Sequence, residues 1–396
     1  MGKRVHGRAT STQVPAVQRA GDGGGMSAEE LVTTFGPDEY KAPFPYMGGK
    51  SRVAAEVWVR FGDVPNYVEP FFGSGAVLFK RPAEHDWRER VETVNDADGM
   101  VANFWRALKA DPEAVAEAAD WPVSECDLHA RHAWLQGQRD DITRRLEGNP
   151  EWYDAKAAGW WVWATCLWIG GPLFADGPWV VVDGELVCAP RERGVKRKRP
   201  HLGNAGMGIH RQLPHLGDAG MGIHRKRPHL GDAGRGECDQ WSEHLRIYML
   251  QLADRLRRVR VCCGDWSRVC GPTPTIKMGN PTGVFLDPPY SQDERDAGCY
   301  AVDKPGVAAE CLKWCLEHGD DPRLRIALCG YAGEGHEPLE AAGWSVLAWK
   351  ACGGFSNRRK QGTNDNKHRE RIWFSPHCLS AEAEAPHQPT LQEVAT

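Results

Sequence analysis

The pattern of hydrophobic and polar positions changes twice along this chain of 396 residues. Between residues 41 and 108, short apolar segments alternate with amphipathic ones. Residues 66–71 (NYVEPF) and 90–96 (RVETVND) have the β-branched content and the polar ends of strands. Helices are expected before residue 66, after the glycine-rich turn at residues 73–75, and up to about residue 108. This order of elements is typical of one half of an α/β sheet.

The alternation returns in the second half of the chain. Strands are expected within residues 255–266, 283–290, 323–331, 344–350 and 370–376, and a helix at 307–319. Because strands and helices alternate on both sides of an irregular middle segment, the pattern predicts one α/β sheet with helices on both faces, interrupted by a smaller insert. The expected parts are a disordered leader (1–40), the first half of the sheet (41–108), the insert (109–245), the second half (246–376) and a disordered tail (377–396).

Two segments of the expected insert have an unusual composition. Residues 159–174 (GWWVWATCLWIGGPLF) are apolar, but their sixteen residues fall short of a membrane span, so we expect a buried Trp-rich helix. A 14-residue unit occurs three times over residues 198–239, and each copy has three glycines and one proline. Serial turns are therefore expected there. The repeated histidines lack cysteine partners, so no metal site is predicted.

The cysteine pattern and the charge distribution indicate the cellular compartment and the kind of ligand. Its thirteen cysteines include no C-x-x-C pair and fit free thiols in a reducing cytoplasm. The first thirty residues lack the apolar segment of a signal peptide. The net charge is −4, yet residues 191–230 carry ten Lys and Arg against two acids, and residues 350–371 carry seven against two. Such segments are either solvated loops or phosphate-binding patches. The candidate nucleic-acid contacts are Arg197, Lys198, Arg199, Arg225, Lys226, Arg227, Arg358 and Arg359.

A glycine-rich turn follows the first expected strand, at residues 68–79 (VEPFFGSGAVLF). Gly73 and Gly75 would let a polar ligand approach the backbone amides. The dinucleotide pattern G-x-G-x-x-G fails because Leu78 stands at its third glycine, which disfavours a nicotinamide or flavin cofactor. Asp96 lies 21 residues after Gly75, where an acid typically accepts the ribose hydroxyls of an adenosine-bearing ligand.

A second glycine turn lies upstream, at residues 45–51 (PYMGGKS). It resembles the end of a phosphate-binding loop, but Phe44 stands where the first glycine of G-x-x-x-x-G-K-[ST] is required, so an ATPase is not predicted. The turn is then either a cap before a helix or a device that presents Lys50 to a carboxylate and the Tyr46 ring to a ligand.

The most informative stretch is GVFLDPPYSQ, at residues 283–292, where a buried strand runs into an acid, two prolines and a tyrosine. An exocyclic amine on a nucleobase is a poor nucleophile because its lone pair is delocalised into the ring. Asp287 and the carbonyl of Pro288 could each accept one of its N–H groups and favour a tetrahedral nitrogen. The prolines would hold that carbonyl in place beforehand, and Tyr290 could stack on an extruded base.

The set of PYMGGK, VEPFFGSG, Asn95-Asp96 and DPPY, in this order, resembles the Dam-type DNA adenine methyltransferases. The resemblance covers residues 43–108 and 258–376, and it implies a Rossmann-like methyltransferase sheet. Residues 41–108 would form the cofactor-binding half, 109–245 a target-recognition insert and 246–376 the catalytic half. Relatives usually have Trp where this chain has Tyr46, which keeps an aromatic face.

The resemblance further implies S-adenosylmethionine as cofactor, no metal, and double-stranded DNA as substrate, with a cognate restriction endonuclease as a possible partner. The expected cofactor-binding residues are Tyr46, Gly48, Gly49, Lys50, Glu69, Phe72, Gly73, Gly75, Asp96, Asp265 and Asp287. The expected catalytic residues are Asp287, Pro288, Pro289 and Tyr290. The reaction would be an in-line attack by the N6 amine of a flipped adenine on the sulfonium methyl group.

Three alternatives remain open on the sequence. The DPPY chemistry would serve the N4 amine of cytosine equally well, although S-P-P-Y is the usual cytosine form. A protein or RNA methyltransferase would more often have N-P-P-Y. A DNA-binding relative without activity is disfavoured because all the key side chains are present.

Overall fold

The computed structural model describes residues 40–46, 48–168, 173–174, 179–182, 185–188, 238–290, 306–350 and 366–380. Several segments named above lie outside these residues. They are residues 1–39 of the expected leader, the 14-residue repeats up to residue 237, all eight candidate nucleic-acid contacts, and residues 381–396 of the expected tail.

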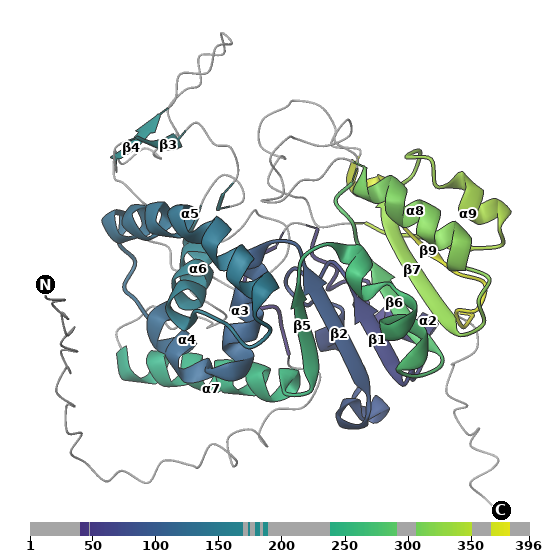
Figure 1. Cartoon of the computed structure of the whole chain (residues 1–396), viewed down its shortest axis with the longest axis horizontal. Coiled ribbons are helices and arrows are strands. Elements are labelled where there is room, and N and C mark those ends of the chain that lie inside the picture. Colours follow the sequence, from purple (N-terminus) through teal and green to yellow (C-terminus); the bar gives the residue numbers. More distant parts are fainter. Residues whose placement is uncertain are drawn as a thin grey trace, which may run out of the picture.

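A seven-stranded sheet in the order β5-β2-β1-β6-β7-β9-β8 forms the centre of the described structure (Figure 1). The strands are β1 (Asn66–Glu69), β2 (Val91–Asp96), β5 (Val259–Cys263), β6 (Thr282–Leu286), β7 (Leu324–Tyr331), β8 (Ser345–Ala348) and β9 (Glu370–Phe374). The first five in spatial order are parallel, and β9 pairs antiparallel with both β7 and β8. A separate two-stranded hairpin joins β3 (Trp179–Val182) and β4 (Glu185–Cys188). Every strand expected from the sequence is present.

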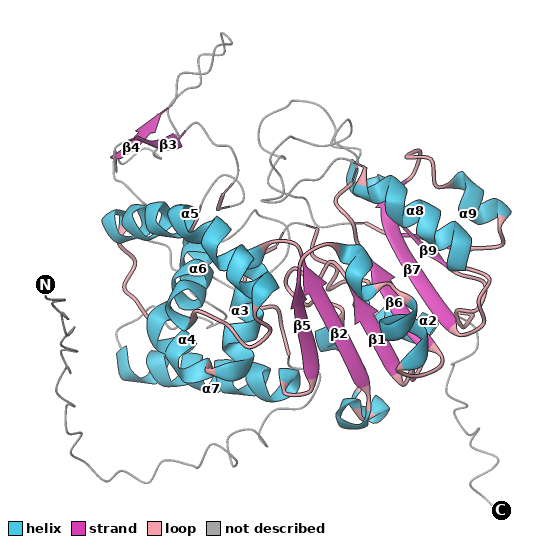
Figure 2. Ribbon diagram, viewed as in Figure 1, coloured by secondary structure: helices cyan, strands magenta, loops and turns pink. Residues whose placement is uncertain are grey.

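Alternate residues of the central strands face two different helical layers, because successive side chains of a strand point to opposite faces. Tyr67 and Phe285 belong to the core shared with α2 (Ala54–Phe61). Val68 and Val284 belong to the core shared with α8 (Val307–His318) and α9 (Glu337–Ala341). Figure 2 shows these helices against the sheet. The prediction of an α/β sheet covered on both faces is confirmed.

Helices from both ends of the expected insert pack beside β5 and around α3 (Gly99–Ala110). These helices are α4 (Pro112–Ala119), α5 (Glu125–Gly148), α6 (Ala155–Leu167) and α7 (Cys238–Leu256), the last of which leads into β5. The Trp-rich helix is α6, and it is buried as expected, but its limits differ from the expected 159–174. It begins earlier because Asp154 caps its first turn, accepting a hydrogen bond from the amide of Ala157.

The helix expected after the glycine turn at residues 73–75 is not formed. Only short 3₁₀ turns follow, namely η2 (Leu78–Lys80), η3 (Ala83–His85) and η4 (Trp87–Glu89), and Arg81 after η2 has an extended ψ of 127°. Pro82 explains this, since a proline disfavours helical geometry in the residue before it and cannot donate the next hydrogen bond.

The shortened turn leaves Arg81 buried against Glu92 of β2, where Arg81 Nη1 lies 3.1 Å from Glu92 Oε1. Arg255 of α7 approaches the same carboxylate, with Nη1 2.6 Å from Oε2 and Nη2 2.9 Å from Oε1. All three side chains are almost fully buried, so two cations and one carboxylate join β2, the turn and α7.

The chain continues in ordered contacts beyond Pro376, where the disordered tail was expected to begin. The amide of Leu379 donates to the carbonyl of Arg60 at 2.8 Å, and Cys378 Sγ lies 3.5 Å from the carbonyl of Ile326. The expected boundary is therefore wrong for residues 377–380, whose backbone and thiol find partners on α2 and β7.

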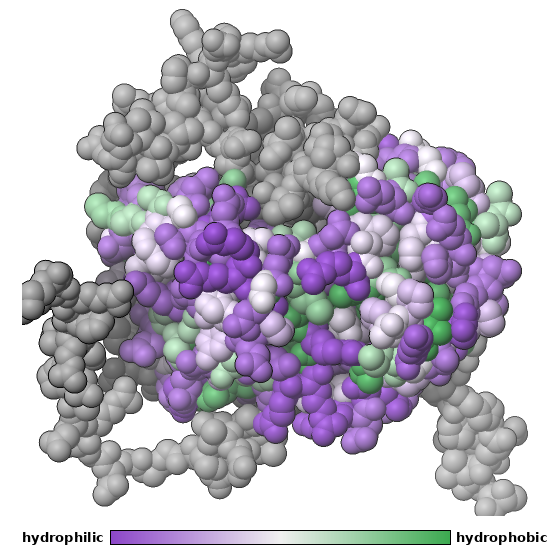
Figure 3. Space-filling model, viewed as in Figure 1, coloured by the Kyte–Doolittle hydropathy of each residue, from purple (hydrophilic) through white to green (hydrophobic). Residues whose placement is uncertain are grey.

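The visible face of the described residues carries mostly polar side chains with scattered apolar ones between them (Figure 3). The large exposed hydrophobic side chains are Trp121 and Val123, both between α4 and α5, and Met278, Leu316 and Val346 elsewhere in the described residues. None of the helices that the structure describes combines the length and apolar content required to cross a membrane.

Candidate active site

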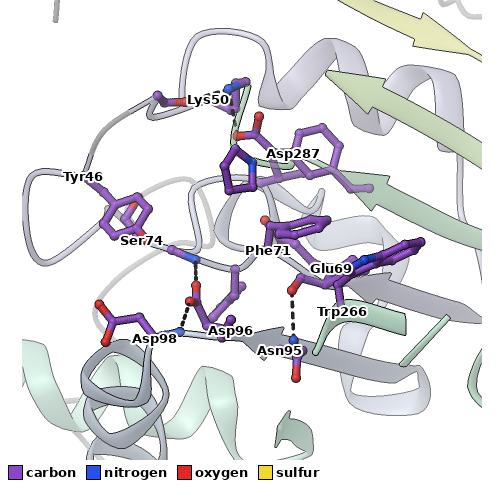
Figure 4. A pocket seen from close by; sticks show the side chains of 18 of the residues that line it. Tyr46, Lys50, Glu69, Phe71, Ser74, Asn95, Asp96, Asp98, Trp266 and Asp287 are labelled. Atoms are coloured by element: carbon purple, nitrogen blue, oxygen red, sulfur yellow. Dashed lines mark hydrogen bonds and ion pairs between the residues drawn. The ribbon is translucent and has the colours of Figure 1, made fainter. Parts of the chain in front are cut away.

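A pocket of about 290 Å³ lies at the carboxyl ends of β1, β2, β5 and β6, the edge where open parallel sheets bind ligands (Figure 4). Nine of the residues expected to bind a cofactor or to carry the chemistry line it together with Asp287: Tyr46, Gly48, Gly49, Lys50, Glu69, Phe72, Gly73, Asp96 and Asp265. Pro289 also lines the pocket. Gly75, Pro288 and Tyr290 are not among its lining residues, although they adjoin residues that are.

The glycine turn and Tyr46 fit into each other. Gly73 has a φ of +47°, and a Cβ placed there would lie 2.5 Å from the ring of Tyr46. A side chain at this position would therefore strain the backbone and displace the ring. The sequence suggested that this glycine leaves room for a ligand, and the structure shows that the Tyr46 ring takes that room.

Asp96 holds the turn from the end of β2. One of its oxygens, Oδ2, accepts a hydrogen bond from the amide of Gly73 at 2.9 Å, and Oδ1 accepts one from the amide of Asp98 at 2.9 Å. Burial, together with the nearby carboxylate of Asp98, raises the pKa of Asp96 to about 7. The carboxylate is thus both a brace for the glycine turn and an acceptor that faces the pocket (Figure 4).

Asn95 joins three strand ends at the floor of the site. Its Nδ2 donates to the carbonyl of Pro70 after β1 at 3.1 Å and to the carbonyl of Gly264 after β5 at 3.0 Å. This places Phe71 and Trp266 on the same wall, with ring centroids 6.2 Å apart and ring planes 27° apart. Both rings line the pocket and offer a flat apolar surface.

Glu69 is buried at the end of β1 and accepts a hydrogen bond from the Tyr67 hydroxyl at 2.9 Å. Burial raises the pKa of Glu69 well above its ordinary value. A buried carboxylate is costly to keep without compensation. Its position in the wall of the pocket suits it to a cationic ligand group.

Lys50 connects the G-G-K turn to the DPPY segment. Its ammonium lies 2.7 Å from Asp287 Oδ2 and 2.8 Å from the carbonyl of Gly48. The exposed fraction of the side chain is 4% for Lys50 and 19% for Asp287, so the pair is largely desolvated. The sequence left open whether this turn is only a helix cap, and the geometry shows that Lys50 reaches a carboxylate.

Tyr290 lies behind this pair and is buried. Its ring centroid is 5.4 Å from Lys50 Nζ and 4.5 Å from the centroid of Tyr331. Its hydroxyl donates to Glu370 Oε2 at 2.8 Å. In the DPPY segment after β6, Asp287 and Pro289 therefore line the pocket, whereas the ring of Tyr290 is turned into the protein.

Several lining residues were not expected from the sequence. Phe71, Ser74, Asp98, Glu147 and Trp266 all contribute to the wall. Asp98 had a local signal, since it caps α3 by accepting from the amide of Met100. Glu147 had none, because it comes from α5 in the insert and reaches the pocket only through the packing of α5 near β5.

The electrostatic character of the pocket follows from its lining residues. Six of them are acidic, namely Glu69, Asp96, Asp98, Glu147, Asp265 and Asp287, whereas Lys50 is the lining residue with a positive charge. Such a wall favours a ligand with positive charge and hydroxyl donors. Among the described residues, no group of three or more His, Cys, Asp or Glu side chains is arranged to hold a metal ion.

Comparison with known proteins agrees with this geometry. Residues 46–126 match the family model of the D12 class N6 adenine-specific DNA methyltransferases, a range that contains both glycine turns and Asp96. The DPPY segment lies beyond the matched range. No curated protein matches the chain. Residues 46–126 are thus similar to the D12 class N6 adenine-specific DNA methyltransferases, and the seven-stranded sheet with a pocket at its strand ends is consistent with that similarity.

Proposed function

We propose that this protein transfers a methyl group from S-adenosylmethionine to the N6 amine of an adenine that has been flipped out of double-stranded DNA. The observation that carries the proposal is a single pocket that joins the glycine turn of Gly73 to Asp287. The family match names DNA adenine as the target. The identity of the donor, the base flipping and the roles of individual residues are our inference.

The lining of the pocket fits S-adenosylmethionine in charge and in shape. Its six acidic residues suit a ligand with a sulfonium and an ammonium group, and the adjacent Phe71 and Trp266 rings suit an adenine. We assign the ribose hydroxyls to Asp96, which lies at the end of the second strand of the sheet in sequence. The proposed cofactor site also includes the lining residues Tyr46, Gly48, Gly49, Lys50, Glu69, Phe72, Gly73 and Asp265, and Gly75, which adjoins the lining.

The reacting amine is held by Asp287 and Pro288 in this proposal. Asp287 Oδ2 is engaged by Lys50, so the amine would donate one N–H to Oδ1 and the other to the carbonyl of Pro288. These two acceptors favour a tetrahedral nitrogen, and the prolines reduce the motion lost on binding. Bound S-adenosylmethionine supplies an activated methyl group, so the N–C bond forms as the S–C bond breaks. The extra amine proton leaves through Asp287 to solvent.

Positioning is then the main contribution of the protein to the rate. An aligned amine about 3–3.5 Å from the methyl carbon turns a bimolecular step into an effectively unimolecular one. Pro289 lines the pocket beside Asp287 and would limit how far the base can enter. Because its ring is turned into the protein, Tyr290 would support the DPPY segment instead of stacking on the base. The basic residues near 197–199, 225–227 and 358–359 would contact DNA phosphates.

The test is methyl transfer from labelled S-adenosylmethionine to double-stranded DNA, with nucleoside analysis of the product. We expect N6-methyladenine from the native chain and a loss of roughly 10²- to 10⁴-fold in Asp287→Ala. Asp141→Ala is a matched control, since Asp141 lies on α5 and pairs with Arg145 away from the pocket. Activity of Asp287→Ala near that of the native chain would reject the assignment, and N4-methylcytosine would reject the target.

Two further parts of the proposal concern the setting of the enzyme. We assign target recognition to the insert at residues 109–245 because of its position between the two halves of the sheet, and catalysis to residues 246–376 because they contain the DPPY motif. We also propose a cytoplasmic protein with a cognate restriction endonuclease. Sequencing that detects modified bases in DNA from cells expressing the chain would give the recognised site, and protection of that DNA from a co-encoded nuclease would test the partnership.

A further inference from the structure

Glu370 is a buried carboxylate at the start of β9 that the proposed reaction does not use. Its exposed fraction is 5%, and it accepts a hydrogen bond from the Tyr290 hydroxyl at 2.8 Å. Burying a carboxylate costs several kcal/mol unless it is compensated, whereas an apolar residue there would cost nothing of the kind. The buried Glu370 carboxylate therefore indicates that the Tyr290 hydroxyl requires a hydrogen-bond acceptor.

The pairing of β9 with β7 brings Glu370 close to the DPPY segment that follows β6. Glu370 lies opposite Tyr331 in the antiparallel pairing of β9 with β7, and β7 is the neighbour of β6. The Tyr331 ring packs against the Tyr290 ring at 4.5 Å and 62°. The end of β9 thus meets the residues that follow β6, although 80 positions separate Tyr290 from Glu370 in the chain.

The DPPY segment is consequently held at both ends. At its first residue, Asp287 is paired with Lys50 at 2.7 Å, and at its last residue, the Tyr290 hydroxyl is bonded to Glu370 at 2.8 Å. The two prolines between them limit the backbone to a narrow range of φ. Lys50 Nζ also lies 5.4 Å from the centroid of the Tyr290 ring, so the contacts that hold the two ends of the segment are close to each other.

We infer that Glu370 is a positioning residue that fixes the Tyr290 ring and, through it, the orientation of the Pro288 carbonyl toward the reacting amine. Glu370 is not among the residues that line the pocket. The inference rests on the proposed function and adds a residue from β9, well outside the DPPY motif, to the machinery.

The test combines three single variants and a double variant, with the full chain, DNA and S-adenosylmethionine. Glu370→Ala and Tyr290→Phe each remove one partner of the hydrogen bond, and both should lower kcat by roughly 10- to 100-fold, the effect of losing one hydrogen bond to a charged group. Glu370→Gln keeps an acceptor oxygen and should stay within about threefold of the native kcat. The affinity for S-adenosylmethionine, measured by calorimetry, should be unchanged in all of them.

The double variant separates positioning from general damage. If Glu370 acts through Tyr290, adding Tyr290→Phe to Glu370→Ala should lower kcat no further, since the bond is already lost. Tyr248→Phe is a matched control that removes the hydroxyl of a tyrosine on α7, outside the active site, and should leave kcat unchanged. Tyr290→Phe removes a single oxygen atom, so it keeps the inference falsifiable even if Glu370→Ala does not fold.

Three results would overturn the inference while leaving the proposed function intact: native kcat in Tyr290→Phe, additive losses in the double variant, or Glu370→Gln as impaired as Glu370→Ala. A native chain that transfers no methyl group to DNA would instead overturn the proposed function and, with it, this inference. The native chain is therefore assayed first.

Discussion

Lys50 Nζ lies 2.7 Å from Asp287 Oδ2, although 237 positions separate the two residues in the chain. The pair joins the segment before β1 to the segment after β6, and both residues line the pocket (Figure 4). Because both side chains are largely desolvated, removing one of them leaves an uncompensated charge in the site.

The first prediction follows from this pair. Lys50→Met should lower kcat for methyl transfer about 10²-fold, because Asp287 would lose the cation that orients its carboxylate. Steady-state assays with labelled donor measure the change. Lys313→Met, at an exposed site on α8, is the matched control and should behave like the native chain. Native kcat in Lys50→Met would show that the pair does not orient Asp287.

A second prediction concerns pH. Burial and Asp98 raise the pKa of Asp96 to about 7, and its ionised form is the better acceptor for ribose hydroxyls. Protonation removes that acceptor, so the affinity for S-adenosylmethionine should fall as the pH is lowered from 8 to 6 and should level off above 8. Calorimetry at several pH values measures this. Asp96→Asn should bind more weakly and lose most of the pH dependence between 6 and 8; an unchanged slope would contradict the assignment.

The glycine turn provides a third prediction, with a matched control in the same chain. Gly73→Ala should weaken donor binding at least tenfold, because a Cβ at a φ of +47° would lie 2.5 Å from the Tyr46 ring. Gly137→Ala lies in α5, where the added Cβ would meet no atom within 4 Å beyond its own helix backbone, and it should leave binding unchanged while stabilising the fold by about 0.5–1 kcal/mol. Native affinity in Gly73→Ala would mean that the turn and the Tyr46 ring yield at little cost.

A fourth prediction addresses stability away from the site. Glu92→Ala should lower the free energy of unfolding by about 3–5 kcal/mol, because it removes the carboxylate that pairs with the buried guanidinium group of Arg255 and leaves Arg81 only the longer contact with Asp63 at 3.4 Å. Glu317→Ala, which removes an exposed i,i+4 pair on α8, should cost about 0.3–0.5 kcal/mol. Chemical denaturation compares the two. Similar small losses in both variants would show that the buried pairs contribute little.

Much of the fold could be predicted from the local pattern of apolar and polar residues. The strands β1 and β2 end in the acids Glu69 and Asp96, and the apolar strand β6 is followed at once by Asp287. Such short apolar segments with polar ends predict buried strands. The chemistry of the DPPY segment could likewise be argued from residue types alone. One local expectation failed after Gly75, where Pro82 limits the chain to a 3₁₀ turn despite a helical composition.

The sequence by itself determined the class of sheet, the two glycine turns and the carboxylate that ends the β6 segment, because each is encoded within a few neighbouring residues. Only the tertiary structure decided that Lys50 pairs with Asp287, that the Tyr46 ring occupies the space beside Gly73, and that Glu147 and Glu370 come from distant elements to the site. These contacts join residues far apart in the chain. Their existence depends on how the strands are ordered in the sheet, which no local pattern of side chains specifies.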